Sequence, residues 1–238
     1  MKQSWAGTDV VNEKPEPILD KIQNSTIMVI LIGNQKGGAG KSTLTLLFAN
    51  YLTQMKKRKV TVLDMDYQQS LASKAEKAKI LENEPLYEVV PADLKHFPSL
   101  HSALSSRPGE IILIDLPGKM DDDGLLALFA AADVVLCPFA YDEFSVDSTL
   151  LFAMVLRKIN SKAPFIFIPN RIKNTVKYET KTEVERVMQQ FGIVAPGLAD
   201  RVDFQRISTF QTPLILLPVV LPVLDLIYSQ YLKWEEQT

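Results

Sequence analysis

The chain has 238 residues, a formal net charge of -2, and hydrophobic and charged fractions of 47% and 23%. These values are those of an ordinary globular domain. They exclude a protein that is basic over its whole surface, so a nucleic-acid contact would need a local patch. The one cysteine, Cys137, excludes a disulfide within the chain and favours a cytoplasmic protein.

The first 25 residues are polar and hold two prolines and scattered charges. We expect residues 1–25 to form an N-terminal arm and residues 26–238 to form a single folded domain. No apolar stretch reaches 18 residues without a charge or a proline, so the sequence predicts no membrane-spanning helix.

An apolar run over residues 27–33 precedes a glycine-rich turn, and apolar residues then recur at helical spacing from Ser42 onward. This order of strand, glycine turn and helix is the context that a phosphate-binding loop requires. The turn would direct backbone N–H groups at an anion, Lys41 would contact the β- and γ-phosphates, and the Ser42 hydroxyl would be an oxygen ligand for Mg²⁺. The residues expected to bind a nucleotide are Gly37, Gly38, Ala39, Gly40, Lys41, Ser42 and Thr43.

Helical and extended patterns alternate through the rest of the chain. Helices are expected at residues 69–81, 98–105, 125–132, 146–159 and 178–191, with a last helix after Pro222. Strands are expected at residues 60–63, 86–90, 111–114, 134–139, 165–168 and 214–217. This alternation predicts one α/β domain with a doubly wound, mostly parallel sheet.

Two of the predicted strands end in an aspartate, at Asp64 and Asp115. Ligands of open α/β sheets gather at the carboxyl ends of the strands. A carboxylate at the end of a buried strand is costly unless it meets a cation, so we expect Asp115 to hold Mg²⁺ through water. Asp64 and Asp66 lie at the same edge, and for each the alternative is that it caps the following helix.

The segment Lys36-Gly-Gly-Ala-Gly-Lys41-Ser lacks the first glycine of the ordinary phosphate-binding loop and has a second lysine, Lys36. In this it resembles the deviant Walker A motif of the ParA/MinD family of P-loop ATPases, and the resemblance extends over residues 27–232. It implies the P-loop NTPase fold of the deviant Walker A type and ATP and Mg²⁺ as cofactors. It also implies a homodimer with ATP, in which Lys36 reaches the partner's nucleotide.

The resemblance assigns a catalytic and a metal role near the second predicted strand. By it, Asp66 orients the attacking water, which makes Lys36, Lys41 and Asp66 the expected catalytic residues. Asp64 would lie in the Mg²⁺ and water shell, so the expected metal residues are Ser42, Asp64 and Asp115. The family has a proline where this chain has Tyr67.

Asn170 follows the predicted strand at residues 165–168 and matches the position that reads the adenine base in this family. A side-chain amide can pair with both a donor and an acceptor on an adenine edge. The alternative is an ordinary turn asparagine. The family's next base-contacting loop falls near residues 199–202.

The resemblance is closest to ParA-type DNA segregation ATPases. It implies an ATP-driven dimer that binds DNA non-specifically, associates with the nucleoid when ATP-bound, and hydrolyses ATP slowly. A ParB-like DNA-binding adaptor would stimulate hydrolysis, for partition of plasmid, chromosome or mobile-element DNA.

Two other functions remain open at this point. One is a MinD-like positioning ATPase that cycles on and off membranes, which the acidic Glu235 and Glu236 beside a single Lys233 disfavour. The other is a P-loop synthetase that transfers the γ-phosphate to a carboxylate substrate.

The resemblance places a DNA surface in the C-terminal half of the chain. Lys177 and Lys181 stand four residues apart at the start of the helix predicted at 178–191, so they would share a helix face. The alternative is a solvated charged helix, because acidic residues are interspersed. The candidates are Lys173, Lys177, Lys181, Arg186, Arg201 and Arg206.

Overall fold

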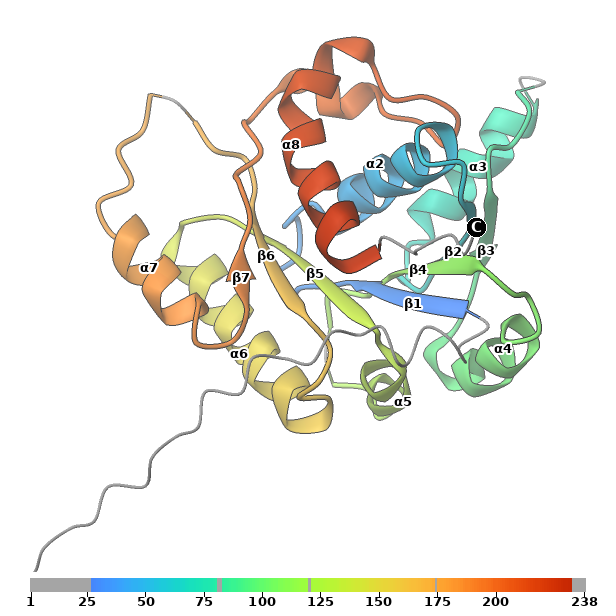
Figure 1. The fold of residues 1–238 in the computed structure, drawn as a ribbon, viewed down its shortest axis with the longest axis horizontal. Coiled ribbons are helices and arrows are strands. Elements are labelled where there is room, and N and C mark those ends of the chain that lie inside the picture. The colour runs from blue at the N-terminus through green and yellow to red at the C-terminus, as the bar shows by residue number, and fades with distance from the viewer. Residues whose placement is uncertain (1–26, 81–82, 120, 174, 233–238) are drawn as a thin grey trace, which may run out of the picture.

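The fold is described from a computed structural model, which places residues 27–80, 83–119, 121–173 and 175–232. The predicted arm, residues 1–25, and the charged end of the chain lie outside these residues. The centre of the fold is one sheet of seven parallel strands in the order β3-β2-β4-β1-β5-β6-β7 (Figure 1). The strands are β1 (Ile27–Ile32), β2 (Lys59–Asp64), β3 (Glu88–Pro91), β4 (Glu110–Asp115), β5 (Val134–Phe139), β6 (Phe165–Pro169) and β7 (Ile193–Val194).

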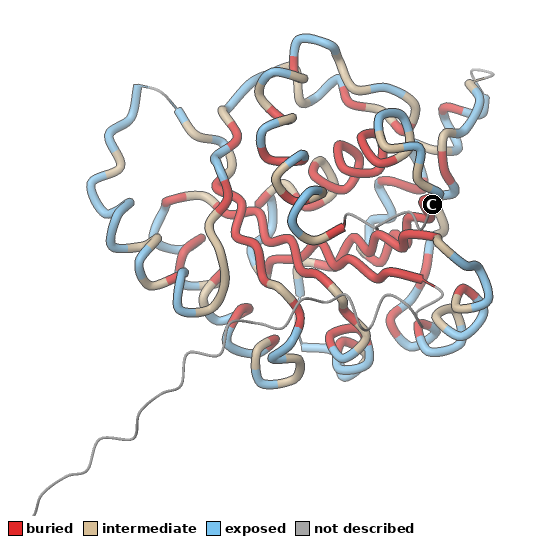
Figure 2. Tube along the Cα trace, viewed as in Figure 1, coloured by how far each residue is buried: buried red, intermediate tan, exposed pale blue. Residues whose placement is uncertain are grey.

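Helices cover both faces of the sheet (Figures 1 and 2). The strands carry apolar side chains on both sides, so each face of the sheet must be shielded from water. One face carries α2 (Lys41–Gln54), α3 (Ser70–Ile80) and α8 (Leu217–Ile227). The other carries α4 (Phe97–Leu104), α5 (Leu125–Ala131), α6 (Glu143–Ile159) and α7 (Lys181–Met188). The predicted single α/β domain with a doubly wound parallel sheet is therefore confirmed.

The register of the central strands brings their carboxyl ends together. Ile32 lies beside Asp115 across β1 and β4, and Asp64 lies beside Asp115 across β2 and β4. The glycine turn that follows β1 and the aspartates that end β2 and β4 thus meet at one edge of the sheet.

The strand predicted at residues 214–217 is wrong. Leu214–Leu216 form a 3-10 turn, and Leu217 begins α8, which has a proline in its first turn and Pro222 inside it. A proline is tolerated in the first turn of a helix, where its missing N–H would have no partner. The last strand of the sheet is the two-residue β7, which is too short to give a sequence pattern.

The predicted helix at 178–191 is shorter than expected, since α7 begins only at Lys181. Lys177 lies in the preceding loop, so the prediction that Lys177 and Lys181 share a helix face is wrong. The chain re-enters the sheet at Gly192, where a Cβ would lie 2.0 Å from the carbonyl oxygen of Phe165. Only a glycine fits this close approach.

The C-terminal helix α8 is present, as the sequence predicted, and it shares the core cluster of α2 on one face of the sheet. Val223, Leu224 and Ile227 are buried there. At the rim, Lys56 forms an ion pair of 2.9 Å with Asp225, and its ammonium lies 4.9 Å from the ring centroid of Tyr228. The stretch Leu214–Leu232 is nevertheless long and apolar enough to cross a membrane by length and composition alone, a test that buried core helices also pass.

Candidate nucleotide-binding site

The glycine turn between β1 and α2 is anchored by Asn34, a residue that the sequence analysis missed. Asn34 is completely buried, and its amide nitrogen donates to the carbonyl of Pro138 at 2.9 Å and to the hydroxyl of Thr149 at 2.7 Å. Its Oδ1 accepts a hydrogen bond of 2.9 Å from the backbone N–H of Lys36. Asn34 therefore ties the start of the turn to β5 and α6. An asparagine directly after a buried apolar strand was the available signal.

Two glycines of the turn have backbone conformations that disfavour any other residue. Gly38 has φ 74° and Gly40 has φ 99°. A Cβ on Gly40 would also lie 2.2 Å from the amide nitrogen of Asn170, so the two segments touch. The turn then leads directly into α2, whose first residue is Lys41. Free N–H groups at a helix start after such a turn are suited to bind phosphate.

Asn170 has both ends of its amide occupied. Its Nδ2 donates to the carbonyl of Ala39 at 2.8 Å, and its Oδ1 accepts from the backbone N–H of Arg171 at 2.9 Å. The structure thus places Asn170 at the predicted site, in contact with the glycine turn. Its adenine-reading role stays a prediction.

Lys41 is buried with only 6% of its surface exposed, although it carries an ammonium group. Burial lowers the pKa of Lys41, and the nearby carboxylates of Asp115 and Asp66 oppose that shift. Its Nζ lies 3.4 Å from the carbonyl of Lys36 and 3.7 Å from the position that a Cβ on Gly118 would take. The segment after β4 therefore passes close to the lysine and the glycine turn.

Asp115 is the residue of the site best suited to hold a cation. It is completely buried, its Oδ1 accepts from the hydroxyl of Thr45 at 3.3 Å, and its Oδ2 has no hydrogen-bond partner among the described residues. Burial raises the pKa of Asp115 to about 7, while the hydroxyl of Ser42 lowers it. An unpaired buried carboxylate oxygen beside a hydroxyl fits Mg²⁺, which prefers oxygen ligands and keeps several waters. Within the described residues no cluster of three or more metal-ligating side chains occurs, so Mg²⁺ would complete its shell with water and phosphate.

Asp64 caps the helix that follows it, which was the alternative weighed from the sequence. Its Oδ2 accepts from the N–H groups of Leu71 and Ala72 at 2.9 and 3.0 Å, in the first turn of α3. Its Oδ1 lies 3.3 Å from the backbone nitrogen of Asp66. Burial raises the pKa of Asp64, and these N–H donors oppose that shift. The place of Asp64 in the Mg²⁺ shell stays a prediction.

Asp66 and Lys36 are more accessible than Asp64 and Lys41. Asp66 is half-buried, and its Oδ1 accepts from the backbone N–H of Gln68 at 3.1 Å. Lys36 is exposed, and its Nζ lies 5.7 Å from the ring centroid of Phe144, which is itself 75% exposed. Lys36, the additional lysine of the glycine turn, thus lies at the protein surface next to α6, where another molecule can reach it.

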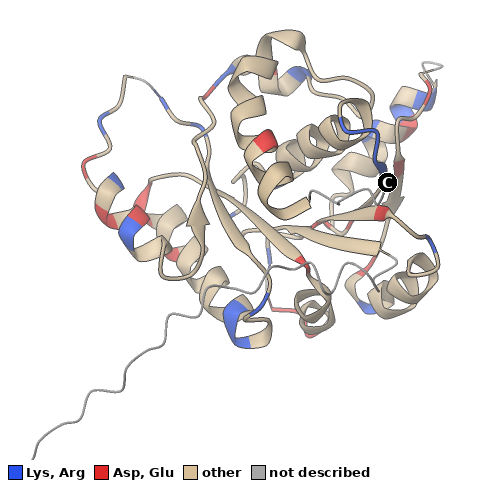
Figure 3. Ribbon diagram, viewed as in Figure 1, with Lys and Arg blue, Asp and Glu red and all other residues tan. Residues whose placement is uncertain are grey.

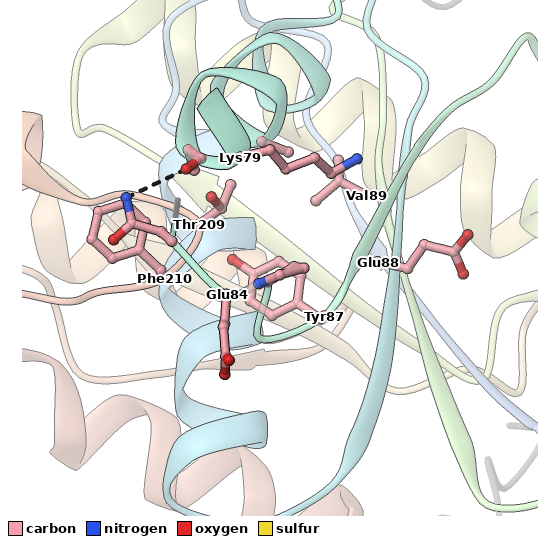
Figure 4. Close-up of a pocket in the computed structure, with 11 residues that line it drawn as sticks. Lys79, Glu84, Tyr87, Glu88, Val89, Thr209 and Phe210 are labelled. Carbon is pink, nitrogen blue, oxygen red and sulfur yellow. Dashed lines mark hydrogen bonds between the residues drawn. The ribbon is translucent and has the colours of Figure 1, made fainter. Parts of the chain in front are cut away.

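A cavity of about 430 Å³ opens beside the glycine turn. Gly40, Thr43 and Asn170 line it, together with Ala199, Asp200 and Arg201 from the loop expected to contact the base. The structure therefore brings these predicted residues together. A second cavity of about 390 Å³, between α3, β3 and the loop holding Thr209 and Phe210, contains none of the predicted site residues (Figure 4).

A glycine turn at a helix start, a buried lysine and a buried aspartate at the end of the adjacent strand define the site of a P-loop nucleotide-binding protein. The model of the CobQ/CobB/MinD/ParA nucleotide binding domain matches residues 30–214, and the chain belongs to this family of P-loop ATPases. A curated relative, the chromosome-partitioning ATPase Soj of Thermus thermophilus, is 28% identical over 157 residues. The match covers 56% of this chain and 62% of that relative's length.

Solved structures share the fold. A plasmid partition protein of Borrelia burgdorferi B31 bound to AMPPNP matches with a TM-score of 0.66 and 21% identity, over 85% of this chain and 98% of that one. The MinD cell division protein of Aquifex aeolicus matches with a TM-score of 0.65 and 18% identity, over 87% and 100% of the two chains. The ATP complex of a McdA variant from Cyanothece matches with a TM-score of 0.65 and 17% identity, over 90% and 100%.

Proposed function

We propose that the protein is a ParA-like ATPase that binds Mg-ATP and dimerises, and that binds DNA non-specifically in that state. The observation that carries this proposal is the buried Oδ2 of Asp115, which has no hydrogen-bond partner in the described part of the chain and lies near Ser42 and Lys41. Leaving a buried carboxylate oxygen and a buried ammonium without full partners costs free energy that a bound Mg²⁺ and polyphosphate would recover. The likeness to Soj, which is named as a chromosome-partitioning ATPase, supports the partition role.

Each site residue has a distinct task in this proposal. The N–H groups of the glycine turn and the Nζ of Lys41 bind the β- and γ-phosphates. Ser42 and Asp115 hold Mg²⁺, which neutralises charge on the phosphate oxygens when bound. Asp66, which is half-buried at the same edge, accepts a hydrogen bond from the attacking water and orients it.

Lys36 carries the dimer part of the proposal. Its exposed position near Phe144 supports this part of the proposal, because an exposed ammonium is accessible to a second copy. A ParB-like adaptor would then stimulate the slow hydrolysis and return the dimer to monomers, in the cytoplasm, with the ATP-bound form on the nucleoid.

Two variants separate nucleotide binding, hydrolysis and dimerisation. Asp66→Ala should bind Mg-ATP with nearly wild-type affinity in calorimetry and lose phosphate release. Lys36→Ala should bind ADP within about twofold of wild type, since it removes no contact within the monomer site, but should form no ATP-dependent dimer in light scattering. Lys162→Ala is the control, because Lys162 is exposed before β6, at the amino ends of the strands.

Equal loss of nucleotide binding in both variants would contradict the proposed roles of Asp66 in hydrolysis and of Lys36 in dimerisation. A stable ATP dimer of Lys36→Ala would make Lys36 a residue of the loop only. A wild-type protein that turns over ATP only with a carboxylate substrate would favour the synthetase. ATP-dependent retention on liposomes in place of DNA would favour the MinD-like alternative. A MinD protein is among the proteins that share this fold.

A further inference from the structure

An apolar groove of about 340 Å³ lies between α5 and α6, on the face of the sheet opposite α2. Leu151, Val155 and Ile159 form one wall, since they stand four residues apart on α6 and share a face of that helix. Leu126 of α5 belongs to the other wall. Leu126, Leu151 and Val155 are 54%, 49% and 42% exposed, so the described residues leave much of this apolar surface uncovered.

Apolar surface gathered in a groove favours a bound segment in a way that single exposed residues do not. Isolated exposed apolar side chains are ordinary, whereas several that line one groove mark a docking site. Covering them recovers about 25 cal/mol for each Å² removed from water. Three aspartates, residues 121–123, line the groove at the start of α5, and they make an anionic membrane surface an unsuitable occupant.

The described chain begins at Ile27, on the same face of the sheet as this groove. Ile27 belongs to the core cluster that α5 and α6 share. Next in β1, the N–H of Val29 donates to the carboxylate of Asp133 at 2.9 Å, and its carbonyl accepts from the N–H of Asp133 at 2.9 Å. Asn160, directly after α6, donates to a carbonyl of α5 at 2.9 Å. The start of β1 and the ends of α5 and α6 therefore meet at the same edge of the sheet, where the arm joins the domain.

The arm carries apolar residues at a suitable distance from this point. Ile18, Leu19 and Ile22 are spaced so that they would lie on one face of a helix. Ile22 is five residues before Ile27 and Ile18 is nine residues before it, so an extended chain spans at most about 17 Å and about 31 Å respectively. Helix α6 has 17 residues and is about 25 Å long. These apolar residues can therefore reach along the groove.

We propose that the groove between α5 and α6 is a docking site for the arm of the same chain. The three apolar residues of the arm lie in it against the exposed apolar residues of the two helices, as in the recognition of an amphipathic segment by a groove. A tethered segment needs little affinity of its own, because its effective concentration at a nearby groove is on the order of mM. Docking requires no nucleotide, so it is separate from the proposed function.

The test measures how fast a disulfide forms between the arm and the groove. Cys137 is completely buried, so two introduced cysteines supply the accessible thiols. The full chain with Ile22→Cys and Val155→Cys is treated with oxidised glutathione in the absence of nucleotide. The control pair is Ile22→Cys with Ser102→Cys. Ser102 is exposed on α4, on the same face of the sheet, and α4 leads into β4, whose first residue pairs with Ile27.

We expect the disulfide within one chain to form at least about tenfold faster in the groove pair than in the control pair, because docking raises the local concentration of the arm at Val155. Ile18→Ser with Leu19→Ser should lower the rate of the groove pair to that of the control pair, whereas Ile18→Leu should keep it. Mass spectrometry of the digested protein identifies the bond, and circular dichroism checks that each variant is folded.

Three outcomes would overturn the docking of the arm. Equal rates in the two pairs would show that the arm has no preference for the groove. A groove pair that stays fast after both serine substitutions would show that the tether alone brings the arm there. Disulfides that join two chains faster than they form within one, seen as dimers in non-reducing electrophoresis, would assign the groove to a second copy.

Discussion

The glycine turn and helix α7 both carry charged residues, but they satisfy these charges in opposite ways. At the turn, Lys41 and Asp115 are buried, and Asp115 has an oxygen with no partner among the described residues. Helix α7 carries both basic and acidic residues (Figure 3). Its exposed Arg186 pairs with Glu183 at 2.6 Å, and its Lys181 lies 3.9 Å from Glu185. A buried charge without a partner indicates an external ligand, whereas exposed charges that pair with each other are stable without one.

This comparison changes the candidate DNA surface. Lys181, Arg186 and Arg206 each have a carboxylate of the same segment within 4 Å, the last at 3.7 Å from Asp203. Lys177 has no such partner within the described residues. The predicted basic face of Lys177 and Lys181 is therefore replaced by a smaller set of cations without an ion-pair partner among the described residues, which also includes Lys173 and Arg201.

The largest effect is expected from the buried lysine. Lys41→Ala should abolish ATP binding, with a loss of at least about 1,000-fold, because several charge-assisted hydrogen bonds to phosphate disappear together. Calorimetry with Mg-ATP measures this, and circular dichroism checks that the variant is folded. Binding within tenfold of wild type would show that the buried charge serves the fold and not a ligand.

Asp115 should make the stability of the nucleotide-free protein depend on pH. Burial raises its folded pKa to about 7, above the unfolded value, so the folded state binds the extra proton and is favoured at low pH. This contribution should fall by about 2 kcal/mol as the pH rises from 5 to 7, and Asp115→Asn should remove that difference. Urea unfolding of both proteins at the two pH values measures it.

An equal pH dependence in wild type and Asp115→Asn would contradict the burial argument. Asp66→Asn serves as the matched control, because Asp66 is half-buried at the same edge of the sheet.

Unpaired and paired lysines should differ in DNA binding. A plot of log affinity against log salt concentration has a negative slope. Lys177→Gln should make this slope less steep by about 0.9, the value for one lost phosphate contact. Lys181→Gln should change the slope less, because Glu185 already balances that lysine. Retention of a duplex by the ATP-bound protein over a salt series measures both, and the same effect on any sequence is expected. Equal slopes for the two variants would contradict the distinction between paired and unpaired cations.

The smallest effect is expected from the surface ion pair on α7. Arg186→Gln should leave the free energy of unfolding nearly unchanged, because exposed pairs are screened by water and salt. Urea unfolding at two salt concentrations checks this, with Glu183→Gln as the partner variant. A clear loss of stability in Arg186→Gln would show that the pair is part of a larger structural contact.

The sequence by itself determined the order of strands and helices, the glycine turn and the family resemblance. These features depend on local rules. Apolar runs and helical periodicity involve residues only a few positions apart. The turn needs glycine at Gly38 and Gly40 because their own φ angles are positive. The same rules were insufficient at 214–217, where a short apolar run suits a strand or a helix, and at the two-residue β7.

Only the tertiary structure decided how the polar groups of the site are used. Asn170 donates to Ala39 across 131 positions of the chain, and Asn34 donates to Pro138 across 104. Whether Asp64 caps a helix, or Asp115 keeps a free oxygen, depends likewise on which donors the fold places beside it. A side chain's type states what it can bind, but its burial and its partners come from residues far along the chain, which only the folded structure brings into contact.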